Sequence, residues 1–222
     1  MTPQPERIAH RGSPLERVEN TLPGFLLAIE RGADAIELDV HVTSDGEVVV
    51  HHDAEYGGRA IAETPWPDVS GVDLGGGMPR LADVLDIVGD KVTMYIELKG
   101  SRIEDAVIGV ARAHGSRFAL HSFDHDAIAR VRERAPDIAC GVLLDQNTPD
   151  PDVVLRRAVD RIRPRDVWPH WSLIDEPLMR VASEVDVRVI AWTVNDVATA
   201  QSLKSLGVHG LCSDDVRLLA NL

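Results

Sequence analysis

The feature that most constrains the fold is a regular alternation of short apolar segments with amphipathic ones over the second half of the chain. Five helical patterns occur there, and they cover residues 103–115, 124–136, 151–161, 176–184 and 196–205. Five strand patterns alternate with them, at 117–123, 138–144, 166–169, 187–194 and 210–213, and a last helix is expected after residue 213. Most of these strands are apolar on both faces, which is typical of a parallel sheet covered by helices.

The same alternation extends toward the N-terminus. Strands are predicted at Glu6–Ala9, Ala35–His41 and Thr93–Leu98, and helices at Leu22–Arg31 and Leu81–Val88. This gives eight strands and about eight helices in 222 residues. Strict alternation without a break in composition favours a closed (β/α)8 TIM barrel over an open doubly wound sheet, whose nucleotide-binding fingerprint is also missing. We therefore expect one catalytic barrel domain over residues 1–222.

Residues 54–79 do not fit this alternation. The segment is rich in Gly and Pro and is too long for an ordinary loop. Its glycines at 75–77 are followed by no Gly-Lys-Ser/Thr sequence, so they predict a flexible loop and not a phosphate loop. Because functional loops of a barrel cluster where strands end, we expect a short insertion that acts as a lid; a disordered surface loop is the alternative.

Two acids alternate with apolar residues in the second predicted strand. Glu37 and Asp39 are two residues apart, so both side chains point to one face. Two buried carboxylates repel each other, and a strand keeps them together when a cation or a network of hydrogen-bond donors lies between them. A solvated edge strand is the competing interpretation. A turn at 44–46 and an apolar strand at 48–50 then place His52 at the end of a hairpin.

Other polar residues stand where strands of the barrel end, the position of barrel active sites. His10 and Arg11 follow the first strand, and Glu97 and Lys99 share a face at the end of the third. Carboxylates without cysteine suit one hard divalent cation, Mg²⁺ or Ca²⁺ with Mn²⁺ as a further candidate, better than zinc. The two basic side chains suit a phosphate, and His10 with His52 suits general acid and base catalysis. The pattern indicates phosphoryl chemistry.

Charge and hydropathy limit the partners and the location. The net charge of −13 disfavours nucleic acid and anionic membranes as partners. The mean hydropathy is −0.08, and no apolar run approaches the roughly 18 residues that span a bilayer. The N-terminus lacks an apolar signal core, so we expect a cytoplasmic protein without stable membrane anchoring. Cys140 and Cys212 lie far apart in apolar segments and are expected to be buried free thiols.

Several short segments are spread along the chain, namely HRG, ENT, GADAIELDVHVTSDG, VVVHHD, MPRLADVL, IELK, HSF, AWTVN and GVHGLCSDD. In combination they resemble the glycerophosphodiester phosphodiesterase family, and the resemblance covers nearly the whole chain. It implies a barrel with one divalent metal ion that hydrolyses glycerophosphodiesters to sn-glycerol 3-phosphate and an alcohol. It also implies three metal ligands, a general acid and a base, two phosphate contacts and two aromatic residues near the substrate. The metal ligands are Glu37, Asp39 and Glu97, and the phosphate contacts are Arg11 and Lys99. His10 and His52 are the acid and base, without an assignment of which is which, and Phe123 and Trp192 are the aromatic residues.

Several alternatives stay open at this point. An enzyme of lysophospholipase D type would need an apolar trough beside the site, and a noncatalytic phosphate-binding barrel would usually have lost one of these residues. The aromatic residues Phe123 and Trp192 can also belong to the barrel core. His121 stands where the family often has a small polar residue. The substrate is expected to be a small molecule, and the protein a monomer or homodimer.

Neighbouring residues have local interpretations as well. Glu19 is placed to orient Arg11, whereas Asn20 is expected as the N-cap of the first helix. His51 should point away from His52 and pack or meet solvent. His41 shares the face of the two acids one step further out, and we expect it at the rim of the site.

Overall fold

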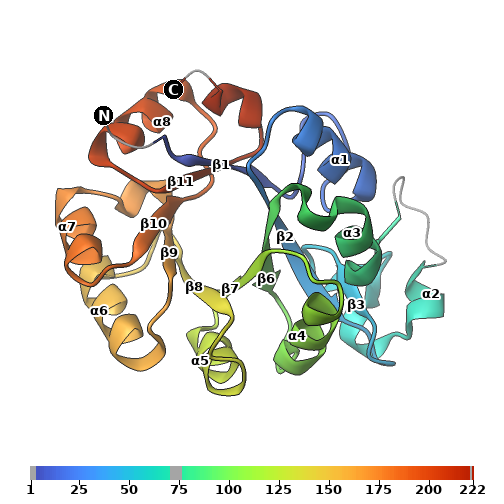
Figure 1. Ribbon diagram of the computed structural model, residues 1–222. Coiled ribbons are helices and arrows are strands. Elements are labelled where there is room, and N and C mark those ends of the chain that lie inside the picture. Colours follow the sequence, from blue (N-terminus) through green and yellow to red (C-terminus); the bar gives the residue numbers. More distant parts are fainter. Residues whose placement is uncertain (1–3, 71–76, 221) are drawn as a thin grey trace.

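The computed structural model describes residues 4–70, 77–220 and 222. Eight parallel strands form a ring, with the helices outside it (Figure 1). They are β1 (Glu6–His10), β2 (Ala35–Val42), β6 (Thr93–Leu98), β7 (Phe118–Ser122), β8 (Ala139–Leu144), β9 (Asp166–Pro169), β10 (Arg188–Ala191) and β11 (Gly210–Ser213). Pairing of β1 with both β2 and β11 closes the sheet. The predicted (β/α)8 barrel is confirmed.

The outer helices follow the predicted order closely. They are α1 (Leu22–Glu30), α3 (Leu81–Val88), α4 (Glu104–Ala113), α5 (His125–Arg134), α6 (Pro151–Ile162), α7 (Glu176–Glu184) and α8 (Val197–Leu206). Short 3₁₀ turns, η2 (Gly89–Lys91) and η3 (Trp171–Leu173), lie before β6 and after β9. The helix expected after residue 213 is only a 3₁₀ turn, η4 (Val216–Leu219). There the Asp215 side chain accepts a hydrogen bond from the backbone nitrogen of Arg217, two residues on, as in a tight turn.

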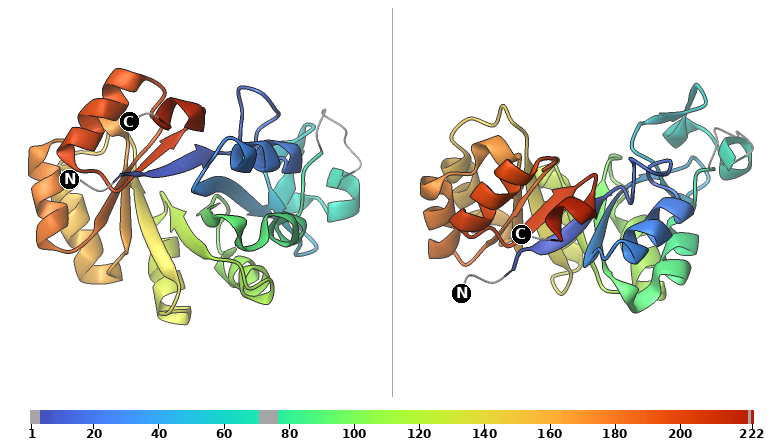
Figure 2. Two further views of the ribbon diagram at one scale, coloured as in Figure 1. Left: turned by 45° about the horizontal axis from the view of Figure 1, so that its top comes forward. Right: turned by 90° about the horizontal axis from the view of Figure 1, so that it is seen from above.

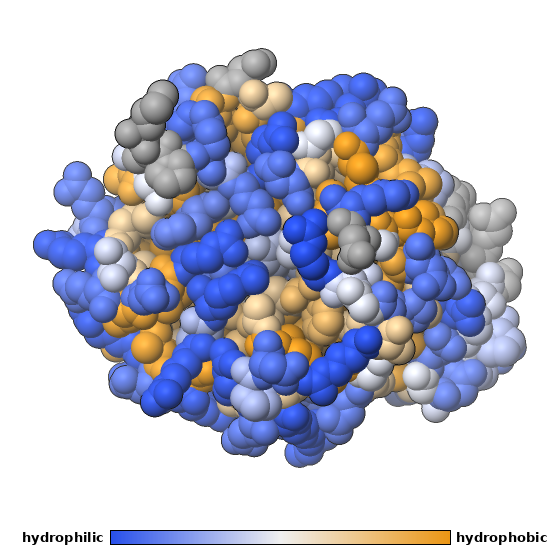
Figure 3. Space-filling model, in the orientation of Figure 1, coloured by the Kyte–Doolittle hydropathy of each residue, from blue (hydrophilic) through white to orange (hydrophobic). Residues whose placement is uncertain are grey.

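All eight strands contribute side chains to the apolar interior of the barrel. Each strand gives one side chain to a buried cluster, in chain order Ile8, Ala35, Tyr95, Ala119, Leu143, Trp168, Ile190 and Cys212. A larger apolar core lies between the strands and the helices. The strands therefore bury both faces, and the polar residues of the site are confined to strand ends. The face turned to the viewer in Figure 3 is largely hydrophilic, with scattered apolar patches.

The hairpin and the segment after it stand at the periphery of the barrel (Figures 1 and 2). β3 (Val48–Val50) pairs antiparallel with β2, as predicted. Within 54–79 the chain forms β4 (Glu55–Tyr56), β5 (Arg59–Ala60), η1 (Ile61–Glu63) and α2 (Trp66–Ser70). Four of its apolar side chains, Tyr56, Ile61, Val69 and Met78, pack on Val49. The flexible loop predicted around the glycines lies mostly in 71–76, outside the described residues, and the role of the segment as a lid stays a prediction.

Two further expectations concern thiols and membranes. Cys140 and Cys212 are buried and free, as predicted. In the described part of the chain, no helix combines the length and the apolar character that crossing a bilayer requires.

Candidate functional site

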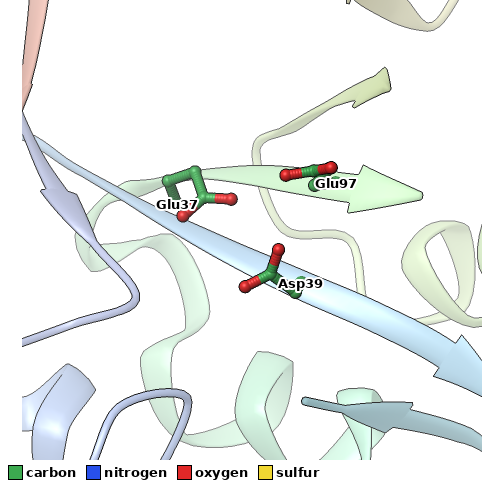
Figure 4. A group of neighbouring side chains, drawn as sticks. All are labelled: Glu37, Asp39 and Glu97. Atoms are coloured by element: carbon green, nitrogen blue, oxygen red, sulfur yellow. The ribbon is translucent and has the colours of Figure 1, made fainter. Parts of the chain in front are cut away.

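Three buried carboxylates point into one space beside the ends of β2 and β6. Glu37 and Asp39 come from β2 and Glu97 from β6, and Figure 4 shows their side chains directed toward one another. One oxygen of each carboxylate lies within 4.8 Å of the others. The register explains this proximity, because Asp39 pairs with Glu97 across neighbouring parallel strands. A solvated edge strand is excluded for these acids, since none is more than 7% exposed.

The environment of the acids separates their pKa values. Burial, reinforced by the charge of Asp39, raises the pKa of Glu97 to about 8. Burial also acts to raise the pKa of Asp39, but the neighbouring Arg11 and Lys99 charges outweigh it and lower that pKa. The Oδ1 atom of Asp39 is buried, and none of the described residues gives it a hydrogen bond. An unsatisfied oxygen among three carboxylates suits a hard cation with oxygen ligands. The residues present therefore fit a divalent metal ion.

Two cations border the acidic cluster. The Nε atom of Arg11 lies 3.2 Å from Oδ2 of Asp39, and its Nη1 donates to Glu19 over 3.0 Å. Lys99 Nζ lies 3.2 Å from Glu97 Oε1 and 3.7 Å from Asp39 Oδ1. Glu19 thus orients Arg11, as the sequence suggested. The two fixed positive charges lie beside the acids, at a place where a phosphate can contact both.

Each of the two predicted catalytic histidines makes a hydrogen bond with a carboxylate through Nδ1. His10 Nδ1 lies 2.7 Å from Asp214 Oδ1, and His52 Nδ1 lies 2.7 Å from Asp53 Oδ1. Such a bond fixes the tautomer and the ring orientation, so Nε2 of each ring is left to exchange protons. Burial acts to lower the pKa of His10, but the bond to Asp214 and the charge of Glu37 outweigh it, and that pKa is raised.

A cavity of about 190 Å³ unites these groups. Eight of the nine predicted site residues line it, namely His10, Arg11, Glu37, His52, Glu97, Lys99, Phe123 and Trp192. The ninth, Asp39, lies fully buried beneath, in contact with Arg11 and Lys99. The structure therefore brings all nine together; their roles stay predictions. Four other side chains complete the wall, His121, Leu143, Trp168 and Cys212.

The two aromatic residues form an apolar side of this cavity. The rings of Phe123 and Trp192 meet edge to face with centroids 5.4 Å apart. Trp192 donates its indole N–H to the carbonyl of Trp168 over 2.9 Å, which fixes the ring, and Phe123 is 40% exposed. Both residues thus line the cavity, and Trp192 also packs against the buried cluster of the barrel interior.

Two local expectations were wrong. The N-cap of α1 is Thr21, whose Oγ1 accepts from the nitrogen of Gly24. Asn20, which has a positive φ of 55°, is instead buried and donates its side-chain N–H to Asp39 Oδ2 over 2.9 Å. His41 is not at an exposed rim: it is 7% exposed, and its Nε2 lies 3.2 Å from the carbonyl of His52. His51 packs edge to face on Tyr56, in agreement with the expectation that it leaves the site.

The sequence reasoning missed two partners of the site, Asp214 and Asn20. Asp214 is held by Asn195, which donates from Nδ2 to its Oδ2 over 2.6 Å and accepts from its backbone nitrogen over 3.0 Å. The GVHGLCSDD segment was a signal for Asp214, but nothing in it indicated the contact with His10. Asn20 belongs to the ENT segment, but its position before the first helix indicated an N-cap and not a contact with Asp39.

Comparisons with known proteins agree with this geometry. Residues 10–218 match the glycerophosphoryl diester phosphodiesterase family. A glycerophosphodiester phosphodiesterase of Caldanaerobacter subterraneus subsp. tengcongensis is 29% identical, over 97% of this chain and 96% of its own. The structure of a Thermotoga maritima glycerophosphodiester phosphodiesterase is 26% identical with a TM-score of 0.83, covering 96% of both chains. An Oleispira antarctica phosphodiesterase, in complex with its product sn-glycerol-3-phosphate, shares the fold at 24% identity and a TM-score of 0.87, covering 97% of this chain and 95% of its own.

Proposed function

The chain belongs to the glycerophosphoryl diester phosphodiesterase family, and we propose that it hydrolyses glycerophosphodiesters to sn-glycerol 3-phosphate and an alcohol with one divalent metal ion and two histidines. Membership makes the protein a phosphodiesterase. The observation that carries the finer proposal is the cavity in which acids, paired cations and two carboxylate-bound imidazoles meet.

The metal ligands in this proposal are Glu37, Asp39 and Glu97. Their carboxylates are buried with one oxygen of each within 4.8 Å of the others, and in the described part of the chain Asp39 Oδ1 accepts no hydrogen bond. The oxygen-only donor set favours Mg²⁺ or Ca²⁺, with Mn²⁺ as a further candidate. When bound, the ion supplies positive charge that offsets charge developing on the phosphoryl oxygens.

The phosphate of the substrate lies against Arg11 and Lys99. The guanidinium offers paired N–H donors, and the ammonium group supplies a point charge on the same side of the cavity. Both groups stabilise the transition state more than the ground state, because negative charge accumulates on the phosphoryl oxygens as the new P–O bond forms. Phe123 and Trp192 pack on the carbon atoms of the substrate.

Proton transfer is divided between His10 and His52. One Nε2 accepts the proton of the attacking oxygen while the new P–O bond forms, and the other Nε2 donates a proton to the leaving alcohol as its P–O bond breaks. The attacking oxygen belongs either to water or to the neighbouring glycerol hydroxyl. The second route passes through a cyclic phosphate, so trapping that species in rapid-quench samples identifies it.

The size of the cavity favours small diesters over lysophospholipids. A volume of about 190 Å³ is of the size of a glycerophosphoryl group, so an acyl chain would have to extend beyond this cavity. Lysophospholipase D activity and noncatalytic phosphate binding are the two rival functions. The assay described next distinguishes them from the proposed activity.

The deciding experiment measures turnover of glycerophosphocholine and glycerophosphoethanolamine before and after chelation, with Mg²⁺, Ca²⁺ or Mn²⁺ added back. We expect chelation to abolish hydrolysis and one of these ions to restore it. Glu37→Gln should not be restored, whereas Asp105→Asn, a change at an acid on α4 that is 73% exposed, should behave like the wild type. Failure to hydrolyse either diester with any of the three ions would refute the proposal, as would a higher kcat/KM for lysophosphatidylcholine.

A further inference from the structure

His121 is a buried polar side chain that the proposed reaction does not use. It lies on β7, is 1% exposed and lines the cavity. Neither ring nitrogen has a hydrogen-bond partner within the described residues. A neutral imidazole carries one donor and one acceptor, and leaving both unpaired away from water is costly and rare. The side chain therefore needs a partner in the working state of the protein.

The aromatic neighbours of His121 do not supply that partner. Its ring meets Trp168 edge to face with centroids 4.5 Å apart, and it is tilted on Tyr95 at 6.3 Å. These contacts hold the ring in place. Among the described residues, Glu37 lies within ion-pair distance, with its Oε1 3.7 Å from Nε2 of His121. A small rotation of that carboxylate closes this gap to a hydrogen bond.

Direct ligation of the metal by His121 does not fit the geometry. Among the described residues, the set whose donor atoms all lie within 4.8 Å of one another comprises only the three carboxylates. His121 is the register partner of Glu97 on the neighbouring strand, but its nitrogens lie outside that set. The ring is thus placed behind a ligand, where ligating carboxylates commonly receive hydrogen bonds.

We propose that His121 is a positioning residue that donates its Nε2–H to Oε1 of Glu37 and thereby fixes this carboxylate as a metal ligand. The inference rests on the metal site of the proposed function. The other oxygen of Glu37, Oε2, already accepts from the backbone nitrogen of Arg11 over 3.3 Å. A donor on each oxygen holds the plane of the carboxylate, so less conformational freedom is lost when an ion binds.

The test measures the affinity for Mn²⁺ directly, from the electron paramagnetic resonance signal of the free ion during titration. His121→Leu removes the donor at similar volume, and we expect the dissociation constant to rise roughly 10- to 100-fold. His121→Gln keeps an N–H near the Nε2 position, and its affinity should stay within about fivefold of the wild type. Thermal unfolding of the chelated proteins reports any separate loss of stability.

Tyr95→Phe is the matched control for disturbance of the barrel interior. It removes a hydroxyl that donates to Glu6 over 2.8 Å, and it leaves the ring beside His121 in place. We expect a lower melting temperature and unchanged Mn²⁺ affinity. Equal losses of affinity in His121→Leu and His121→Gln, or wild-type affinity in His121→Leu, would overturn the inference. If the wild type binds no Mn²⁺, Mg²⁺ or Ca²⁺ at all, the metal site of the proposed function fails and this inference fails with it.

Discussion

Replacing Glu97 by Gln should change how the stability of the metal-free protein depends on pH. The folded-state pKa of Glu97 is raised to about 8 from its ordinary 4.5. A group whose pKa is raised by folding stabilises the protein fully below its unfolded pKa, and this contribution disappears as the pH rises through the folded pKa. The shift of 3.5 units (8 − 4.5) corresponds to about 5 kcal/mol at 1.36 kcal/mol per unit. Between about pH 5 and pH 9 the wild type should lose about 4 kcal/mol of this contribution.

The Glu97→Gln variant lacks the titrating group, so its free energy of unfolding should not show this decrease as the pH rises. Glu97→Gln removes a buried negative charge beside Asp39 and keeps the shape of the side chain. The assay is urea unfolding of both proteins with a chelator at about pH 5 and about pH 9, from which the free energies of unfolding are compared. From about pH 5 to about pH 9, we expect the free energy of unfolding of the variant, relative to that of the wild type, to increase by about 4 kcal/mol. A difference constant within about 1 kcal/mol would refute the account in which burial and the charge of Asp39 raise the pKa of Glu97.

Three further predictions concern catalysis. His10→Ala and His52→Ala should each lower kcat by roughly 10² to 10⁴ in a steady-state assay, and near wild-type kcat in either would contradict its role. Asp214→Asn keeps an acceptor for His10 Nδ1 but removes the negative charge that raises the pKa of His10, so the limb of the kcat/KM–pH profile that reports His10 should move to lower pH. An unmoved profile would show that His10 does not control it. Arg11→Lys and Lys99→Arg both keep the positive charge. Arg11→Lys loses the paired donors of the guanidinium and should lower kcat/KM roughly tenfold or more, whereas Lys99→Arg loses no such pair and should lower kcat/KM less. Equal effects of the last two changes would contradict this distinction.

The acids of the site could be placed from the sequence because their relation is local. Glu37 and Asp39 share a face through the period of two in β2, and Glu97 follows from the same pattern in β6. His52 was placed by the turn and the apolar strand that precede it. Each of these assignments depends only on residues a few positions away, so a pattern along the chain was sufficient.

The partners of these residues depend on closure of the barrel. Ala9 pairs with Ser213 when β1 meets β11, and this register brings Asp214 to His10 although the two are 204 residues apart. A strand pattern shows which residues share a face, but it does not determine the register between strands distant in sequence.

The chain's own pattern thus determined the barrel, its hairpin and the acidic face. Only the tertiary structure decided that Asp214 is the carboxylate that binds His10 Nδ1 and that Asn20 donates to Asp39. The position of the buried His121 beside Glu37 was likewise decided there. The physical reason is that burial and hydrogen bonding at the site arise from contacts across strands and loops. Such contacts exist only after the ring has closed.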